Sequence, residues 1–187
     1  ALERLCDPNS KVSAHYCIDE DGTVYSLVNE EHRAWHAGVS YWRGETDINS
    51  RSIGIELVNP GHECGYRPFP DKQMESLINI SKKIIKRHPI PPRNIVAHSD
   101  IAPSRKRDPG EFFDWRLLAN EGIGLWPSAS EDYDKDFMAM ARVYGFNVHA
   151  DKVTAAFQRH FRPKIIDNKI DEELTCLAAG LLKIINS

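Results

Sequence analysis

The sequence predicts a mixed α/β (α+β) fold, in which helices flank a central sheet and a helical bundle follows at the C-terminal end. Three observations predict this. Apolar and polar residues alternate on both sides of the Asp21-Gly22 turn, which is typical of a β-hairpin over residues 11–28. Residues 71–87 carry apolar side chains at helical spacing. Three further amphipathic stripes follow residue 133 and predict a three-helix bundle.

The composition is that of an ordinary soluble globular protein of 187 residues. Its formal net charge of -3 supplies no basic field, so we expect no nucleic-acid partner. No apolar run approaches the length of a membrane span, and we expect none. The four cysteines show no paired metal-ligand spacing, and we expect them to be free thiols.

A further strand is predicted over residues 49–59, and it contains a carboxylate. Glu56 lies within an apolar run, where burying a charge is costly unless the group is paired or functional. The alternative is a Glu at an exposed strand position. The helix over residues 71–87 follows, with Asp71 as its expected cap and Pro89 as its stop.

Residues 95–110 hold the best candidate site. Ile95–Ala97 reads as a buried strand and the next residues as a loop, so His98 stands where sites on α/β folds often lie. Imidazole and carboxylate are both good metal ligands, which makes His98 and Asp108 candidates. Lys106 can stabilise an oxyanion beside them. The alternative is a loop histidine and a capping aspartate.

A second candidate surface lies in the loop over residues 33–44. Trp35 and His36 stand among small residues, where an aromatic ring can cover a sugar face and an imidazole can hydrogen-bond. The alternative is a tryptophan that fills the edge of the core. His15, alone on the polar face of its strand, is expected to be a hydrogen-bonded structural residue.

These stretches resemble one known family. The strings HSDIAPSRKRDPG at 98–110, RAWHAG at 33–38 and SIGIE at 52–56 are similar to N-acetylmuramoyl-L-alanine amidases of the AmpD/AmiD type. The resemblance implies the fold shared with peptidoglycan recognition proteins and T7 lysozyme. It also implies zinc-dependent (Zn2+) hydrolysis of the amide between N-acetylmuramic, or 1,6-anhydro-N-acetylmuramic, acid and L-alanine.

The same resemblance implies roles for particular residues. His98 and Asp108 would bind zinc, Lys106 would stabilise the transition state, and Glu56 would be the general base. A third zinc ligand would be a histidine on a strand before residue 1. His15 and His36 are conceivable substitutes that we do not favour. The expected substrate contacts are Trp35, His36, Asn59 and Arg105.

The predicted domains are a catalytic domain over residues 1–126, a linker over 127–133 and a helical domain over 134–187. Residues 144–161 resemble peptidoglycan-binding three-helix domains, and the alternative is a bundle that only stabilises the fold. We expect peptidoglycan or muropeptides as partners, and the periplasm or cell envelope as the location, with the cytoplasm as the alternative. A non-catalytic peptidoglycan-recognition protein is the alternative function if the third ligand is absent.

Overall fold

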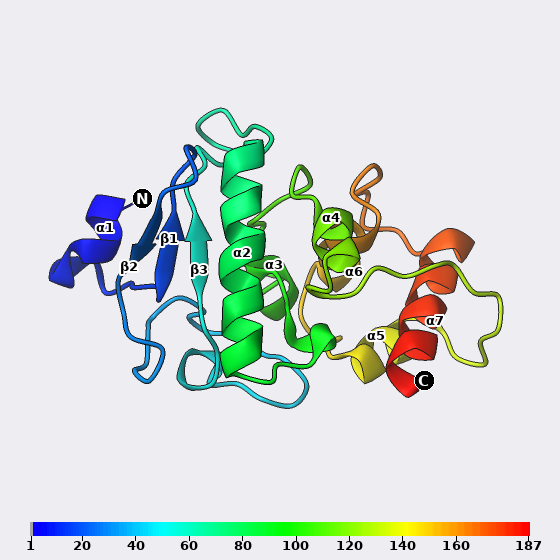
Figure 1. Cartoon of the computed structure of the whole chain (residues 1–187). Helices are drawn as coiled ribbons and strands as arrows, with labels where there is room; N and C mark the ends of the chain where they lie inside the picture. Colours follow the sequence, from blue (N-terminus) through cyan, green and yellow to red (C-terminus); the bar gives the residue numbers. More distant parts are fainter. Residues whose placement is uncertain (1) are drawn as a thin grey trace. The chain divides into compact units, whose positions relative to one another are not determined.

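The computed structural model describes residues 2–187 and contains one three-stranded mixed sheet (Figure 1). β1 (Tyr16–Ile18) pairs antiparallel with β2 (Val24–Ser26) and parallel with β3 (Ile55–Leu57), in the order β2-β1-β3. The predicted mixed fold and its hairpin are therefore confirmed. A helix, α1 (Leu2–Cys6), and a short 3-10 turn, η1 (Pro8–Ser10), precede the sheet.

The strand predicted over residues 49–59 is shorter than expected. The segment before β3 contains a 3-10 turn, η2 (Ile48–Ser50), and pairs only from Ile55 onward. The reason is local, because Asn49 Oδ1 accepts hydrogen bonds from the backbone of residues 36 and 37. Ser52 Oγ also donates to Ile48 O at 2.6 Å. These polar side chains organise a loop rather than a strand ladder.

The predicted strand over Ile95–Ala97 is also not formed. A 3-10 turn, η3 (Pro92–Asn94), comes first, and the extended residues after it pair with no described strand. His98 then opens a helix, α3 (His98–Ile101), rather than a loop. The Ala97 N–H donates to the Asp100 side chain at 2.7 Å, so a carboxylate takes the place of a neighbouring strand.

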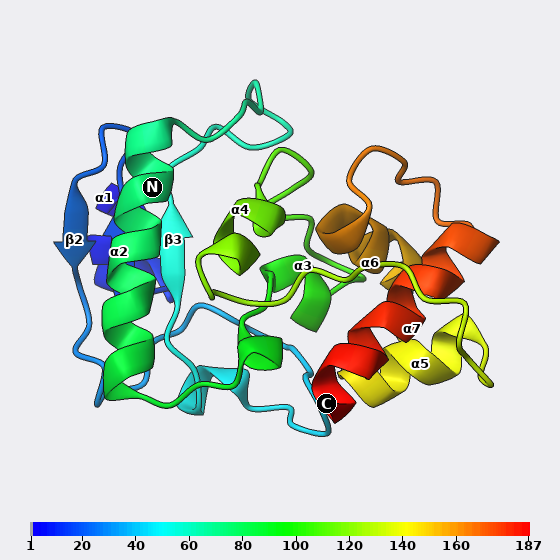
Figure 2. The same cartoon turned by 45° about the vertical axis from the view of Figure 1, so that its right-hand side comes forward.

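α2 (Asp71–Arg87) lies across one face of the sheet (Figure 2). Its apolar stripe, including Met74, Leu77 and Ile84, is buried, as the spacing predicts. Pro70 occupies the cap position, so Asp71 lies in the first turn and is not the cap. Buried Gln73 donates to Ile18 O and Val58 O, both at 2.9 Å, and so joins the last residue of β1 to the residue that follows β3.

The three C-terminal helices are α5 (Phe137–Tyr144), α6 (Val153–Phe161) and α7 (Glu172–Asn186), as predicted, and α4 (Trp115–Asn120) precedes them. The Asp171 side chain caps α7 by accepting from the Leu174 N–H at 2.9 Å. Asp151 does not cap α6, because Lys152, in the left-handed conformation, holds that position. The bundle core is aromatic, and its fully buried rings are Phe137, Phe146, Phe157 and Phe161.

The chain divides into two compact units. The first contains the residues up to Ser40 together with Thr46–His88, and the second contains Tyr41–Glu45 together with Pro89–Ser187. The short segment in the second unit is anchored by Trp42, whose ring contacts Tyr144 and Phe146 at centroid distances of 5.7 and 5.3 Å. The boundaries predicted at residues 126 and 134 stay predictions.

The segment predicted to be a linker is partly docked within the second unit. The Ser130 N–H donates to Cys176 O at 2.9 Å. A Cβ on Gly180 would collide with Ser128 O, so α7 has a glycine where the 127–130 segment runs against it. Residues 131–136, in contrast, are all exposed.

Among residues 2–187, no helix combines the length and apolar character that a bilayer crossing needs.

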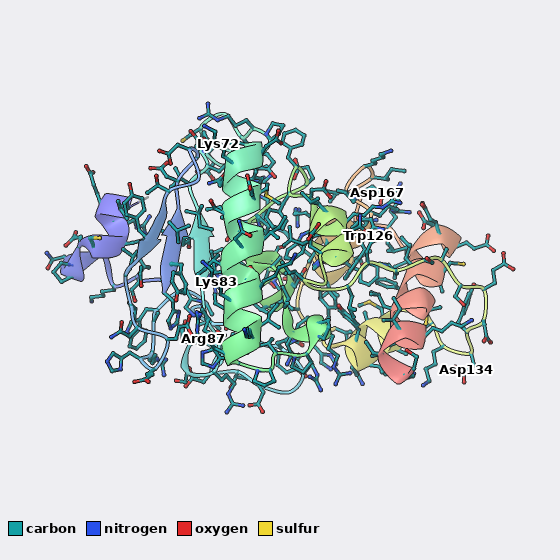
Figure 3. All side chains as sticks on the ribbon, in the orientation of Figure 1. Lys72, Lys83, Arg87, Trp126, Asp134 and Asp167 are labelled. Atoms are coloured by element: carbon teal, nitrogen blue, oxygen red, sulfur yellow. The ribbon has the colours of Figure 1, made fainter. Side chains whose placement is uncertain are left out.

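A partly buried carboxylate in the first unit joins the hairpin to the end of α2. Glu30 accepts hydrogen bonds from Tyr16, Arg87 and His88, and its side chain is 12% exposed. Figure 3 labels Arg87 at the C-terminal end of α2. The hydrogen bond from Arg87, with those from Tyr16 and His88, lowers the pKa of Glu30 from 4.5 to about 2, against the opposing effect of burial.

We predict that Glu30→Gln lowers the free energy of unfolding by about 2 kcal/mol at neutral pH, because charged hydrogen bonds are lost. A lowered folded-state pKa stabilises the protein above pH 4.5 and loses this effect as pH falls through about 2. Urea unfolding from pH 7 to pH 3 should therefore show the gap between wild type and variant shrinking. Glu31→Gln, at an exposed neighbouring position, is the control. A gap independent of pH would contradict the assignment.

Candidate active site

His98 and Asp108 form a polar pair in the second unit. His98 Nδ1 lies 2.9 Å from Asp108 Oδ2, and the two side chains are 16% and 53% exposed. Arg105 Nη2 lies 3.4 Å from His98 Nε2. Because guanidinium only donates, Nε2 is the acceptor and Nδ1–H donates to Asp108. The imidazole and the carboxylate thus meet on a partly open surface, and their role as metal ligands stays a prediction.

Backbone hydrogen bonds hold the two halves of this pair together. The Ser99 N–H donates to Asp108 O at 3.0 Å, so the residue after His98 is tied directly to Asp108. The Ala102 N–H closes the turn on His98 O at 3.0 Å. The Lys106 N–H donates to Ala102 O at 3.0 Å. The positions of both side chains therefore depend on the first turn of α3.

The electrostatic surroundings keep Asp108 ionised. Partial removal from water raises the pKa of its carboxyl group, but the hydrogen bond from His98 and the positive charge of Lys106 lower it more. The net result is a pKa below the usual range for an aspartate. An anionic oxygen beside an imidazole is a donor combination that divalent metals bind.

Glu56 lies in the first unit, on β3, in register with Cys17 of β1. Its residue is partly buried, as its place in an apolar run predicted. Burial and then the charge of Glu56 raise the pKa of the Cys17 thiol, so the thiol stays neutral beside the carboxylate. β3 therefore presents a carboxylate whose partner in register on the central strand, β1, carries no charge.

The histidine in the hairpin has a structural role. His15 is fully buried, and its Nδ1 accepts from the Gly54 N–H at 3.0 Å. Its Nε2 lies 3.0 Å from His32 O, so Nε2 carries the proton and donates. Both ring nitrogens are thus committed to backbone groups, in keeping with the structural role expected for His15.

His36 packs edge-on against His15. Its ring meets the His15 ring edge-on at a centroid distance of 5.6 Å. Its Nε2 lies 3.4 Å from Ser52 Oγ. A Cβ on Gly54 would collide with the His36 ring, so the ring lies directly on the backbone that leads into β3.

Trp35 is 56% exposed, which rules out the alternative of a core-filling ring. The Arg33 guanidinium lies 4.4 Å from the centroid of its ring, and the Trp35 N–H donates to Ser13 Oγ at 2.9 Å. Asn59, in contrast, is engaged within its own loop. Its Nδ2 donates to Arg67 O at 2.9 Å and its Oδ1 accepts from the Gly61 N–H at 3.1 Å. A substrate role for either residue stays a prediction.

One pair of polar residues escaped the sequence reasoning. Asp100 lies inside the 98–110 string, and its partner His160 lies in α6 at a distance of 2.7 Å. Asp100 and His160 are 60 positions apart in the sequence, so no local spacing could have predicted their contact. The available signal was that Asp100 lies within the 98–110 string although it is not a candidate metal ligand.

The donor types at His98 and Asp108 fit a zinc ion, whose usual protein ligands are imidazole nitrogen, thiolate and carboxylate oxygen. The structure over residues 2–187 contains no group of three or more His, Cys, Asp or Glu side chains arranged for a metal. The described residues therefore supply two adjacent donors.

The fold and the His98–Asp108 pair together define a class of protein. It is a mixed α/β protein with an imidazole–carboxylate site beside a lysine. The family model described as N-acetylmuramoyl-L-alanine amidase matches residues 1–111, more than half of the chain. The chain therefore belongs to this amidase family and is an enzyme of that class.

Individual relatives agree with this assignment. The chain is 38% identical to the N-acetylmuramoyl-L-alanine amidase AmiD of Escherichia coli, over 98% of this chain and 77% of AmiD. It is 44% identical to the 1,6-anhydro-N-acetylmuramyl-L-alanine amidase AmpD of Haemophilus influenzae, over 56% of this chain and 55% of AmpD.

Solved structures agree as well. AmiD from E. coli, in complex with the substrate anhydro-N-acetylmuramic acid-L-Ala-D-gamma-Glu-L-Lys, gives a TM-score of 0.87 at 36% identity, over 98% of this chain and 83% of AmiD. AmpDH3 from Pseudomonas aeruginosa, in complex with anhydromuramic pentapeptide, gives 0.88 at 30% identity, over 98% and 86% of the two chains.

We predict that Gly54→Ala displaces the His36 ring and lowers the melting temperature, because the added methyl group has no room. NMR of the histidine side chains should show the His36 signals shifted. Gly61→Ala is the spatial control, because a Cβ there meets nothing within 4 Å, although its positive φ of 73° adds backbone strain. Unchanged His36 signals in Gly54→Ala would contradict the packing described here.

Proposed function

We propose that the chain is a zinc-dependent amidase that cleaves the bond between an N-acetylmuramic, or 1,6-anhydro-N-acetylmuramic, acid and L-alanine. The observation that carries the proposal is the pair of donors at 2.9 Å, His98 and Asp108, within the amidase-like string. The substrate class follows from the anhydro-muropeptide complexes of AmiD and AmpDH3, which match nearly the whole chain.

His98 and Asp108 would hold the zinc ion in this proposal. When bound, zinc lowers the pKa of a water molecule and polarises the carbonyl of the scissile amide. A catalytic zinc site takes three protein ligands, so these two donors are part of the set. Asp108 suits the role because an aspartate side chain is anionic at neutral pH, as a metal ligand must be.

Glu56 would be the general base in this scheme. Its carboxylate takes a proton from the attacking water and passes it to the nitrogen of the leaving L-alanine. Cys17, the partner of Glu56 in register, has a neutral thiol. That partner is therefore not a second anion that would compete with Glu56 for the proton.

Lys106 would stabilise the oxyanion that forms when water adds to the amide carbonyl. Its positive charge already acts on Asp108, two residues away, so it lies within electrostatic reach of the site. Trp35, exposed and braced by Arg33, offers an aromatic face for the sugar.

We further propose that the enzyme works in the periplasm or cell envelope, where the C-terminal helices would add affinity for wall polymer. The likeness of residues 144–161 to peptidoglycan-binding domains supports this. Cell fractionation tests it, and recovery from the cytosol alone would overturn it.

We predict that Glu56→Ala lowers kcat by about 10²–10⁴-fold, because a general base contributes that much, while bound zinc is unchanged. The measurements are release of L-alanyl peptide from an anhydro-muropeptide and metal content by mass spectrometry. The control is Glu75→Ala, at an exposed position on α2.

His98→Ala is the complementary variant, and it should lose both zinc and turnover. His149→Ala, in an exposed loop, should lose neither. Near-normal turnover in Glu56→Ala would remove Glu56 from the mechanism. Full zinc content in His98→Ala would show that the metal binds elsewhere.

A further inference from the structure

A second hydrogen-bonded pair, Asp100 and His160, is buried next to the His98–Asp108 pair in the same string. Asp100 of α3 and His160 of α6 are 1% and 3% exposed, and His160 Nδ1 lies 2.7 Å from Asp100 Oδ2. The Trp115 ring stacks on the His160 ring at a centroid distance of 3.9 Å and an interplanar angle of 20°. The imidazole is therefore fixed in its orientation by the ring and in its tautomer by the carboxylate.

The same carboxylate oxygen holds the backbone beside the site. Asp100 Oδ2 accepts from the Ala97 N–H at 2.7 Å as well as from His160. A carboxylate only accepts, so Nδ1 of His160 carries the proton and donates. Burying a carboxylate is costly unless hydrogen-bond donors compensate it. Removing His160 would therefore destabilise the present position of the Asp100 side chain.

Movement of Asp100 would affect His98 and Asp108 through two neighbouring backbone N–H groups. Ala97 immediately precedes His98, and its N–H would lose or change its acceptor. Ser99, between His98 and Asp100, ties its N–H to Asp108 O at 3.0 Å. The orientation of both candidate ligands thus depends on a turn that the Asp100 side chain anchors, and His160 of α6 holds that side chain.

We infer that Asp100 and His160 are positioning residues that set the geometry of the His98–Asp108 pair, so that the C-terminal helices support the active site. The role in catalysis rests on the proposed function of that pair. Hydrogen-bond partners behind metal ligands typically change metal affinity by about 10–100-fold when they are removed.

The test uses three variants of the full chain. His160→Phe keeps a flat ring against Trp115 and removes the donor. His160→Asn returns an N–H donor at a similar distance from the backbone. Gln158→Met is the matched control, because Gln158 is fully buried on the same helix and bonds Asp167, Asn168 and Lys169 rather than α3.

The first measurement is amide hydrogen exchange without metal. We expect Ala97 and Ser99 to exchange about tenfold faster in His160→Phe, with partial recovery in His160→Asn. Gln158→Met should lower the melting temperature and leave both amides protected. A folded His160→Phe whose Ala97 and Ser99 amides exchange at wild-type rates overturns the inference. So does Gln158→Met exposing those amides equally, because general loosening of the bundle would then explain the effect.

The second measurement is zinc titration with kinetics at saturating zinc. His160→Phe should bind zinc about tenfold more weakly and lower kcat while KM stays near the wild-type value. Gln158→Met should match wild type in both. If wild type and His98→Ala bind zinc equally, the proposed function fails, and the exchange data still decide whether the pair positions α3. Faster exchange with unchanged zinc affinity and kcat would limit the pair to folding and overturn its catalytic role.

Discussion

Buried backbone N–H and C=O groups must find partners, and much of this structure follows from the way polar side chains supply them. The three strands pair over only three residues each, so the sheet satisfies few of these groups. Gln73 extends the junction of β1 and β3, and His15 closes on Gly54 just ahead of β3. Fully buried imidazole and amide groups thus do what longer strands do in other folds.

The candidate catalytic groups follow segments of backbone that side chains support. Glu56 follows the backbone that His15 holds, and His98 follows the backbone that Asp100 holds. In each case a single side-chain acceptor fixes the position of one backbone N–H. The cost is that a single substitution can free the 95–97 segment, because that segment pairs with no described strand that could replace the lost bond.

The sequence was most informative where the signal is local. The hairpin, α2 and the three C-terminal helices follow from periodicity and turn residues, and the His98–Asp108 pair lies within one short string. The strand predicted over 95–97 failed because apolar character alone does not distinguish an extended segment held by a side chain from a strand. The pairing of Asp100 with His160 and the docking of Trp42 on α5 depend on folding across many residues.

The docked start of the 127–136 segment has a consequence for cleavage of the chain. A protease would reach the exposed residues 131–136 most easily. The two pieces would nevertheless share the aromatic contacts of Trp42, the Asp100–His160 pair and the Ser130–Cys176 bond. Nicking at this point would therefore yield two fragments that migrate separately only after denaturation, and that behave as one particle under native conditions.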